Sequence, residues 1–126
     1  YEILTSDEYE WTPPENLGPT VNTQVGDEHP ALSGDGLRLI FFSFHRADTG
    51  LSEATRNRTD EPFGPAQPLG EEFRNRSVER GIALSGDGLV LVFGSKRPGG
   101  PGGEGNLNLW QATRPNLSTP FSKPVC

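Results

Sequence analysis

The sequence predicts an all-β protein built from repeated units of short strands. The segment Ala31–Ser43 recurs as Ala83–Ser95 at an offset of 52 residues (85 − 33 = 52 for its serines), and such a period indicates a repeat architecture. Hydrophobic residues make up only 32% of the chain, with Gly 16 and Pro 12, which disfavours long helices. The central strand of each copy is apolar at consecutive positions, so it needs cover on both faces. Short strands joined by Gly/Pro turns are typical of a sandwich, barrel or propeller.

Each copy of the recurring segment predicts a strand, a tight turn and a second strand. The turns read Ser-Gly-Asp-Gly at 33–36 and at 85–88. Glycine adopts positive φ at little cost and aspartate bonds its own backbone, so these residue types favour a turn. The second strands are expected at 37–44 and 89–95.

The repeat extends on both sides of this segment. Upstream, residues 11–18 match 63–70 at the same offset of 52 (63 − 11 = 52). Downstream, residues 51–56 match 109–114 at an offset of 58 (109 − 51 = 58). The additional residues fall in the Gly/Pro-rich stretch 98–105, and insertions within repeats map to loops. The repeat unit is therefore expected to be four short strands.

Taken in order, the chain is expected to hold about two and a half units in one domain, 1–126. Residues 1–18 form a partial unit, with a third strand at 1–6 and an outer, proline-containing edge strand near 14–18. A linker follows at 19–28. The two complete units span 29–70 and 81–126. Their expected strands are 29–33, 37–44, 51–56 and 66–69 in the first, and 81–85, 89–95 and 106–113 in the second, which ends on 120–125.

These residues resemble the WD40-like propeller repeat of TolB-type proteins, also called the PD40 repeat. The resemblance is carried by Glu28, Pro30–Gly36 and Leu39–Ser43 in the first unit, and by Ser95–Gly100 and Asn108–Trp110 in the second. It covers nearly the whole chain and implies four-stranded antiparallel blades of a β-propeller, either partial or completed by oligomerisation. It also implies a periplasmic or extracellular location.

The sequence departs from that family pattern at four positions. Ile82 replaces the proline of the first strand, and Ser52 stands where the second unit has Trp110. Gly34 and Gly86 replace the proline that usually precedes the turn aspartate, which predicts looser turns.

The candidate ligand- or partner-binding residues are polar groups that the resemblance places around a channel mouth: Glu28, His29, Arg46, Arg80 and Arg97. The alternative interpretation is an ordinary polar rim. A single histidine beside acids lacks a metal-ligand spacing, so no metal site is predicted. The glycine-rich loop 97–105 lacks the Gly-Lys-Ser/Thr ending of a nucleotide cradle, and no cofactor is predicted. Aromatic residues at repeat positions are expected in the core: Trp11, Phe63, Trp110 and Phe121.

The sequence predicts no catalytic residues. Ser33 and Ser85 lack the strand–elbow–helix setting of a hydrolase nucleophile, and a single aspartate per turn is too few oxygen ligands for calcium. The leading hypothesis is a non-catalytic binding or scaffold module that presents channel-mouth loops to a protein or other partner. The alternative is a propeller fragment of a larger exported enzyme such as a peptidase, a lyase or a glycan-active protein. A third interpretation is purely structural, with chains associating through their sheet faces.

Charge and cysteine content limit the classes of partner. The net charge is −6, with no basic stripe, which argues against nucleic acid and against anionic membranes. No signal peptide or membrane span is recognised. Cys126 has no cysteine partner within the chain. Because an incomplete ring leaves apolar sheet faces open, a protein partner or self-association is expected.

Overall fold

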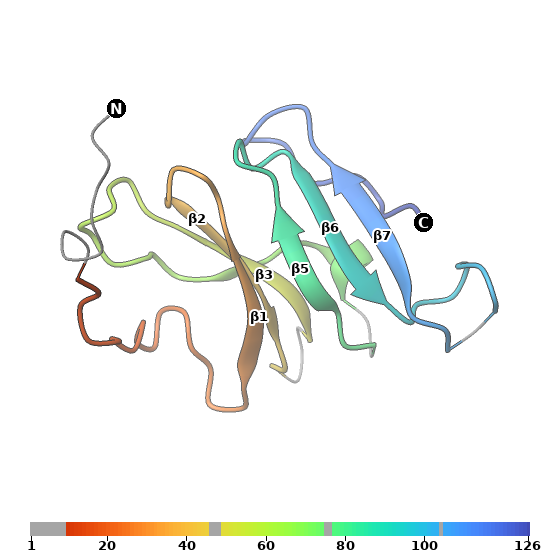
Figure 1. Cartoon of the computed structure of the whole chain (residues 1–126), viewed down its shortest axis with the longest axis horizontal. Coiled ribbons are helices and arrows are strands. Elements are labelled where there is room, and N and C mark those ends of the chain that lie inside the picture. Colours follow the sequence, from red (N-terminus) through yellow and green to blue (C-terminus); the bar gives the residue numbers. More distant parts are fainter. Residues whose placement is uncertain (1–9, 46–48, 75–76, 104) are drawn as a thin grey trace.

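The chain folds into two antiparallel β-sheets that pack face to face (Figure 1). The computed structural model describes residues 10–45, 49–74, 77–103 and 105–126. The first sheet has the order β1 (Asp27–Leu32), β2 (Arg38–Ser43), β3 (Gly50–Thr55), β4 (Gln67–Pro68), and the second has β5 (Arg80–Leu84), β6 (Val90–Ser95), β7 (Asn108–Thr113). A 3-10 turn, η2 (Glu71–Phe73), lies between the sheets in sequence. The all-β prediction is confirmed.

The sequence repeat is reproduced in the strand register. The strands expected at 37–44 and 89–95 are the central strands β2 and β6 of the two sheets. Each first strand shifts register at the same repeat position, between Glu28 and Ala31 in β1 and between Arg80 and Ala83 in β5. β1 and β5 lie side by side where the sheets meet (Figure 1).

Two expected edge strands differ from the prediction. In the second sheet the fourth strand is reduced to one bridge, Gln111↔Val125, which reproduces the Glu53↔Gln67 pair of the first sheet 58 residues later (111 − 53 = 58). Residues 10–18 contain no strand, so the outer strand expected near 14–18 does not form. Two proline residues in that stretch cannot donate ladder hydrogen bonds. The strand expected at 1–6 lies outside the described residues.

The main core fills the space between the two sheets. Ile40, Phe42 and Leu51 of the first sheet share one buried cluster with Leu91 and Phe93 of the second. The remaining members come from both sheets and from the segments that follow them: Ala31, Phe73, Ile82, Trp110, Ala112 and Phe121. This cluster joins the two sheets. Of the four aromatic residues expected in the core, Trp110 and Phe121 lie here and Phe63 is also buried, but the expectation for Trp11 is wrong, because that residue is 97% exposed.

A second cluster covers the other face of the first sheet. Leu39, Phe41 and Ala54 pack there against Val21 of the linker and Phe63. The corresponding face of the second sheet, which points away from the first, has less cover: Leu109 is 72% exposed and Val125 62%. The two sheets therefore resemble each other in strand order but not in what covers their outer faces.

An arginine in each unit fixes the turn to an aromatic ring. Arg114 is nearly fully buried, donates from Nε to the Gly88 carbonyl (2.9 Å) and lies 4.1 Å above the Phe121 ring. Arg56 repeats this arrangement with the Gly36 carbonyl (2.9 Å) and the Phe63 ring (4.3 Å).

Arg114 also crosses between the sheets. Its guanidinium donates to Glu53 on β3 (3.1 and 3.3 Å), and Arg38 on β2 donates to the same carboxylate (3.1 Å). Removing one member of so buried a group leaves an uncompensated charge and costs about 3–5 kcal/mol. The ion pair between Arg114 and Glu53 therefore holds the two sheets in one relative position.

The two Ser-Gly-Asp-Gly turns touch each other. The Gly34 N–H donates to the Gly86 carbonyl (2.9 Å), and a Cβ added at Gly34 would lie 3.1 Å from both the Cα and the carbonyl oxygen of Gly86. A proline at position 34 would remove that donor. The absence of proline there therefore has a packing reason, and the turns, which were expected to be loose, are fixed by a backbone contact.

We expect Gly34→Ala to destabilise the protein and Gly86→Ala not to. At position 34 the new methyl overpacks against backbone, which costs about 1–3 kcal/mol. At position 86 a Cβ meets nothing within 4 Å, so the reduced freedom of the unfolded chain stabilises by about 0.4–1 kcal/mol. Urea unfolding of the two variants measures the difference. Equal stability of the two variants would contradict the turn contact.

Candidate functional site

Three of the predicted binding residues lie at the register shifts of the first strands, β1 and β5, which are β-bulges. Glu28 and His29 lie on β1, and Arg80 opens β5. The side chains of His29 and Glu28 are 34% and 47% exposed, with 3.6 Å between His29 Nε2 and Glu28 Oε1. Because β1 and β5 pack against each other, the structure places an acid–imidazole pair and a guanidinium on neighbouring strands at equivalent register positions.

His29 has an unusual backbone conformation. Its φ is 55°, and it is the one non-glycine residue with positive φ in the described part of the chain. The repeat-equivalent residue is Gly81, whose φ of 56° is nearly the same. Each bulge therefore requires the left-handed conformation, which glycine adopts freely and histidine only at a cost. Non-glycine residues in this region concentrate at functional sites.

Arg97 is engaged in structural contacts. It donates to Glu79 Oε1 (2.6 Å) and to the Glu72 carbonyl (3.2 Å), and its guanidinium lies 5.1 Å from the Phe93 ring and 5.5 Å from the Trp110 ring. With a side chain 12% exposed, it orders the strand end beside the candidate site. Arg46 lies outside the described residues.

The serine hydroxyls are occupied within their turns. Ser33 donates to Asp35 (2.7 Å) while accepting from the Arg38 N–H (3.0 Å). Ser85 does the same with Asp87 (2.6 Å) and the Val90 N–H (2.9 Å). Both segments are therefore tight turns, as the residue types predicted. Among the described residues, no group of three or more His, Cys, Asp or Glu is arranged to hold a metal ion.

These hydrogen bonds lower the pKa of both turn carboxyls. The Ser33 hydroxyl, then the Leu37 N–H, stabilises the charged form of Asp35 and lowers its pKa below the ordinary 3.8. The Ser85 hydroxyl, then the Leu89 N–H, lowers the pKa of Asp87 in the same way.

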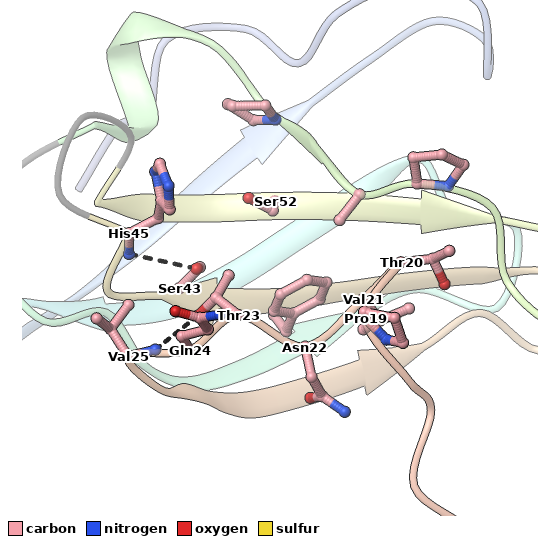
Figure 2. Close-up of a pocket in the computed structure, with 14 residues that line it drawn as sticks. Pro19, Thr20, Val21, Asn22, Thr23, Gln24, Val25, Ser43, His45 and Ser52 are labelled. Carbon is pink, nitrogen blue, oxygen red and sulfur yellow. Dashed lines mark hydrogen bonds between the residues drawn. The ribbon is translucent and has the colours of Figure 1, made fainter.

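A pocket on the outer face of the first sheet was not predicted. It has a volume of about 820 Å³, with Phe41, Ser43 and Ser52 on the strands, the linker residues 19–25 on one side and residues 65, 66 and 68 on the other. Figure 2 shows Ser43 and Ser52 on adjacent strands, with Thr23–Val25 towards one end and Pro19–Val21 towards the other. His45 completes the lining. The sequence signal for this pocket was that Ser52 stands in the place of Trp110. From the sequence alone, this difference indicates only a departure from the repeat.

A comparison with family models, with curated proteins and with solved structures gives no significant match to this chain. Among the described residues no helix is long and apolar enough to span a membrane.

We expect His29→Gly to raise the free energy of unfolding by about 1 kcal/mol, because it removes the cost of holding a non-glycine residue in the left-handed backbone conformation. The reciprocal change, Gly81→Ala, should lower it by a similar amount, since a Cβ there meets no neighbour and only the φ opposes it. Thermal and urea unfolding of both variants test the pair. A destabilised His29→Gly protein would show that the imidazole contributes more than its backbone costs.

The lowered pKa values of the two turn carboxyls predict that the protein loses stability in acid. Their folded-state pKa lies below the unfolded value of 3.8, so their contribution is present above that pH and is lost as pH falls through the folded pKa. Asp35→Asn/Asp87→Asn should therefore flatten the dependence of unfolding free energy on pH between about pH 5 and 2.

The double variant Ser33→Ala/Ser85→Ala tests the cause of the pKa shift, because the serine hydroxyl is the largest cause of each shift. It should also flatten the profile while keeping both carboxylates. An unchanged slope in both double variants would contradict the assignment.

Proposed function

We propose that the two sheets are neighbouring blades of a β-propeller and that the chain is a non-catalytic binding and scaffold module. In this proposal the polar residues at the bulges of β1 and β5 face a partner, and the open sheet faces receive further blades. The packing of the two sheets and the sequence repeat support this proposal.

The observation that carries the proposal is that the sheets pack through non-equivalent faces. Leu51 of the first sheet is 1% exposed in the contact, whereas its repeat equivalent in the second sheet, Leu109, is 72% exposed. Conversely, Leu91 lies in the contact, and its equivalent Leu39 lies on the outer face of the first sheet. Such a head-to-tail contact adds further units in the same direction and closes into a ring when the rotation allows it.

The two outer faces are therefore complementary. The outer face of the second sheet carries Leu109 and the equivalents of the residues that fill the contact from the first sheet. The outer face of the first sheet carries Leu39 and, directly opposite it, Leu32, which is 50% exposed. A second copy can thus place its first sheet on the second sheet of this chain as the two sheets already pack within it.

The proposal predicts that single face variants complement each other. Leu109→Glu and Leu32→Glu should each stop self-association, because each puts a charge into one side of the apolar contact. An equimolar mixture should form a 1:1 dimer, since each variant retains the face that the other has lost. Analytical ultracentrifugation of the separate and mixed proteins measures this.

Ser118→Glu adds the same charge to an exposed loop and should leave association unchanged. If neither the equimolar mixture nor the wild-type protein associates at high concentration, the head-to-tail proposal is contradicted. Turnover of an ester, peptide or glycan substrate that is lost on changing an Asp, Glu or His would contradict the non-catalytic part.

A further inference from the structure

We propose that the pocket on the outer face of the first sheet binds a small, uncharged aromatic molecule of about indole size that carries an N–H or O–H donor. The ring would occupy the space that larger side chains fill at the equivalent place in the second sheet. This proposal stands independently of the propeller proposal, because it rests on the pocket and on the internal repeat.

The repeat shows which side chains differ between the two sheets. The strand residues beneath the pocket, Phe41 and Ser43, are equivalent to Phe93 and Ser95 and have the same identities. Ser52, however, replaces Trp110, and the repeat equivalent of Val21 is Phe73 (73 − 21 = 52). The pocket therefore has the same base as the second sheet but lacks two rings.

In the second sheet those two rings are fully used. Phe73 is 1% exposed and Trp110 7%, and the centroids of Phe73 and Phe93 lie 6.2 Å apart in an edge-to-face arrangement. In the first sheet the same region is open and has a volume of about 820 Å³, within the range of about 300–1,000 Å³ that small-molecule pockets occupy. A bound aromatic ring would give Phe41 the ring contact that its equivalent Phe93 makes with Phe73.

The polar groups of the pocket favour a neutral ligand with a hydrogen-bond donor. Among the described residues its lining contains no Asp, Glu, Lys or Arg, and His45 is the one ionisable side chain there. A permanently charged ligand would therefore lose hydration without finding a permanent counter-ion among them. The hydroxyls of Ser43 and Ser52 belong to residues that are only 3% and 6% exposed. A few oriented polar groups on an apolar surface are what a specific small-molecule site requires.

The pocket walls are held in place before any ligand binds. The linker wall is joined to the opposite wall by the Ala66 N–H donating to the Thr20 carbonyl (2.9 Å) and by the Thr20 hydroxyl donating to the Phe63 carbonyl (3.1 Å). At the other end, Thr23 donates from its N–H (2.5 Å) and hydroxyl (3.0 Å) to Asp27. Such preorganisation reduces the entropic cost of binding.

A neighbouring sheet would not remove the need for a ring. Phe42 covers the second sheet within this chain, and its repeat equivalent on the outer face is Gly94. A second copy packed head to tail would therefore bring a glycine to the place where the existing contact has a phenyl ring. The space above Phe41 would remain available to a ligand.

The test is a titration of the whole chain with indole, followed by two-dimensional NMR. We expect saturable shifts at Val21, Phe41 and Ser52. Ser52→Trp, which gives the first sheet the residue of the second, should weaken indole binding at least tenfold. Val21→Phe fills the other end of the pocket and should also weaken it, so one variant remains informative if the other fails to fold.

Two controls make the result specific. Trp11→Ala should leave indole binding unchanged, because Trp11 is 97% exposed and lies outside the pocket lining; loss of binding in this variant would show stacking on the surface and overturn the proposal. Indole-3-acetate should bind more weakly than indole. Unchanged affinity for indole in both filled variants, or equal affinity for the two ligands, would also overturn it.

Discussion

The structure depends on one constraint, which is that the central strand of the first sheet is apolar on both faces. Phe41 and Phe42 are consecutive residues of β2, so their side chains point to opposite faces, and they are 3% and 0% exposed. They belong to different buried clusters. Each phenyl ring contributes on the order of 1.5–3 kcal/mol when it is buried, so the sheet requires a layer on either side. The second sheet supplies one layer, and the linker and Phe63 supply the other.

The repeat provides the scaffold, and its unequal positions provide the candidate chemistry. Histidine at position 29 takes a left-handed backbone that the second unit gives to Gly81. Ser52 leaves a pocket where Trp110 is buried in the second unit. The backbone positions are equivalent, so these differences lie in the side chains and in what covers each sheet face. The internal comparison thus takes the place of a homologue.

Polar contacts define how the sheets are oriented. Apolar burial is non-directional, so on its own it would permit the two sheets to slide or rotate. The Glu53 carboxylate, shared by Arg38 and Arg114, and the backbone bond between the two glycine turns each require one geometry. Gly34 makes the second of these possible, because a side chain there would press against the facing turn.

Much of the fold followed from the sequence. The repeat, the Ser-Gly-Asp-Gly turns and the two-faced apolar strands predicted the central strands and their separate sheets, because turn chemistry and period-2 patterning act locally. They also predicted the burial of Phe63, Trp110 and Phe121, but not the exposure of Trp11. The edge strands were predicted less well: residues 14–18 and the fourth strand of the second sheet depend on what is available to pair with them. Of the candidate site, the sequence identified Glu28, His29 and Arg80 but gave no indication that Arg97 is engaged with Glu79.

What only the tertiary structure decided is which face of each sheet meets the other. Leu51 and Leu109 occupy the same repeat position and read alike in the sequence, yet one is buried between the sheets and the other is exposed. The repeat marks Ser52 as a departure from Trp110, but the pocket itself cannot be predicted from patterning, because a cavity is defined by distant segments, here 19–25 and residues 65, 66 and 68, that meet over the sheet. Local residue preferences determine strands and turns, whereas the position of one sheet on another is set by contacts between residues far apart in the chain.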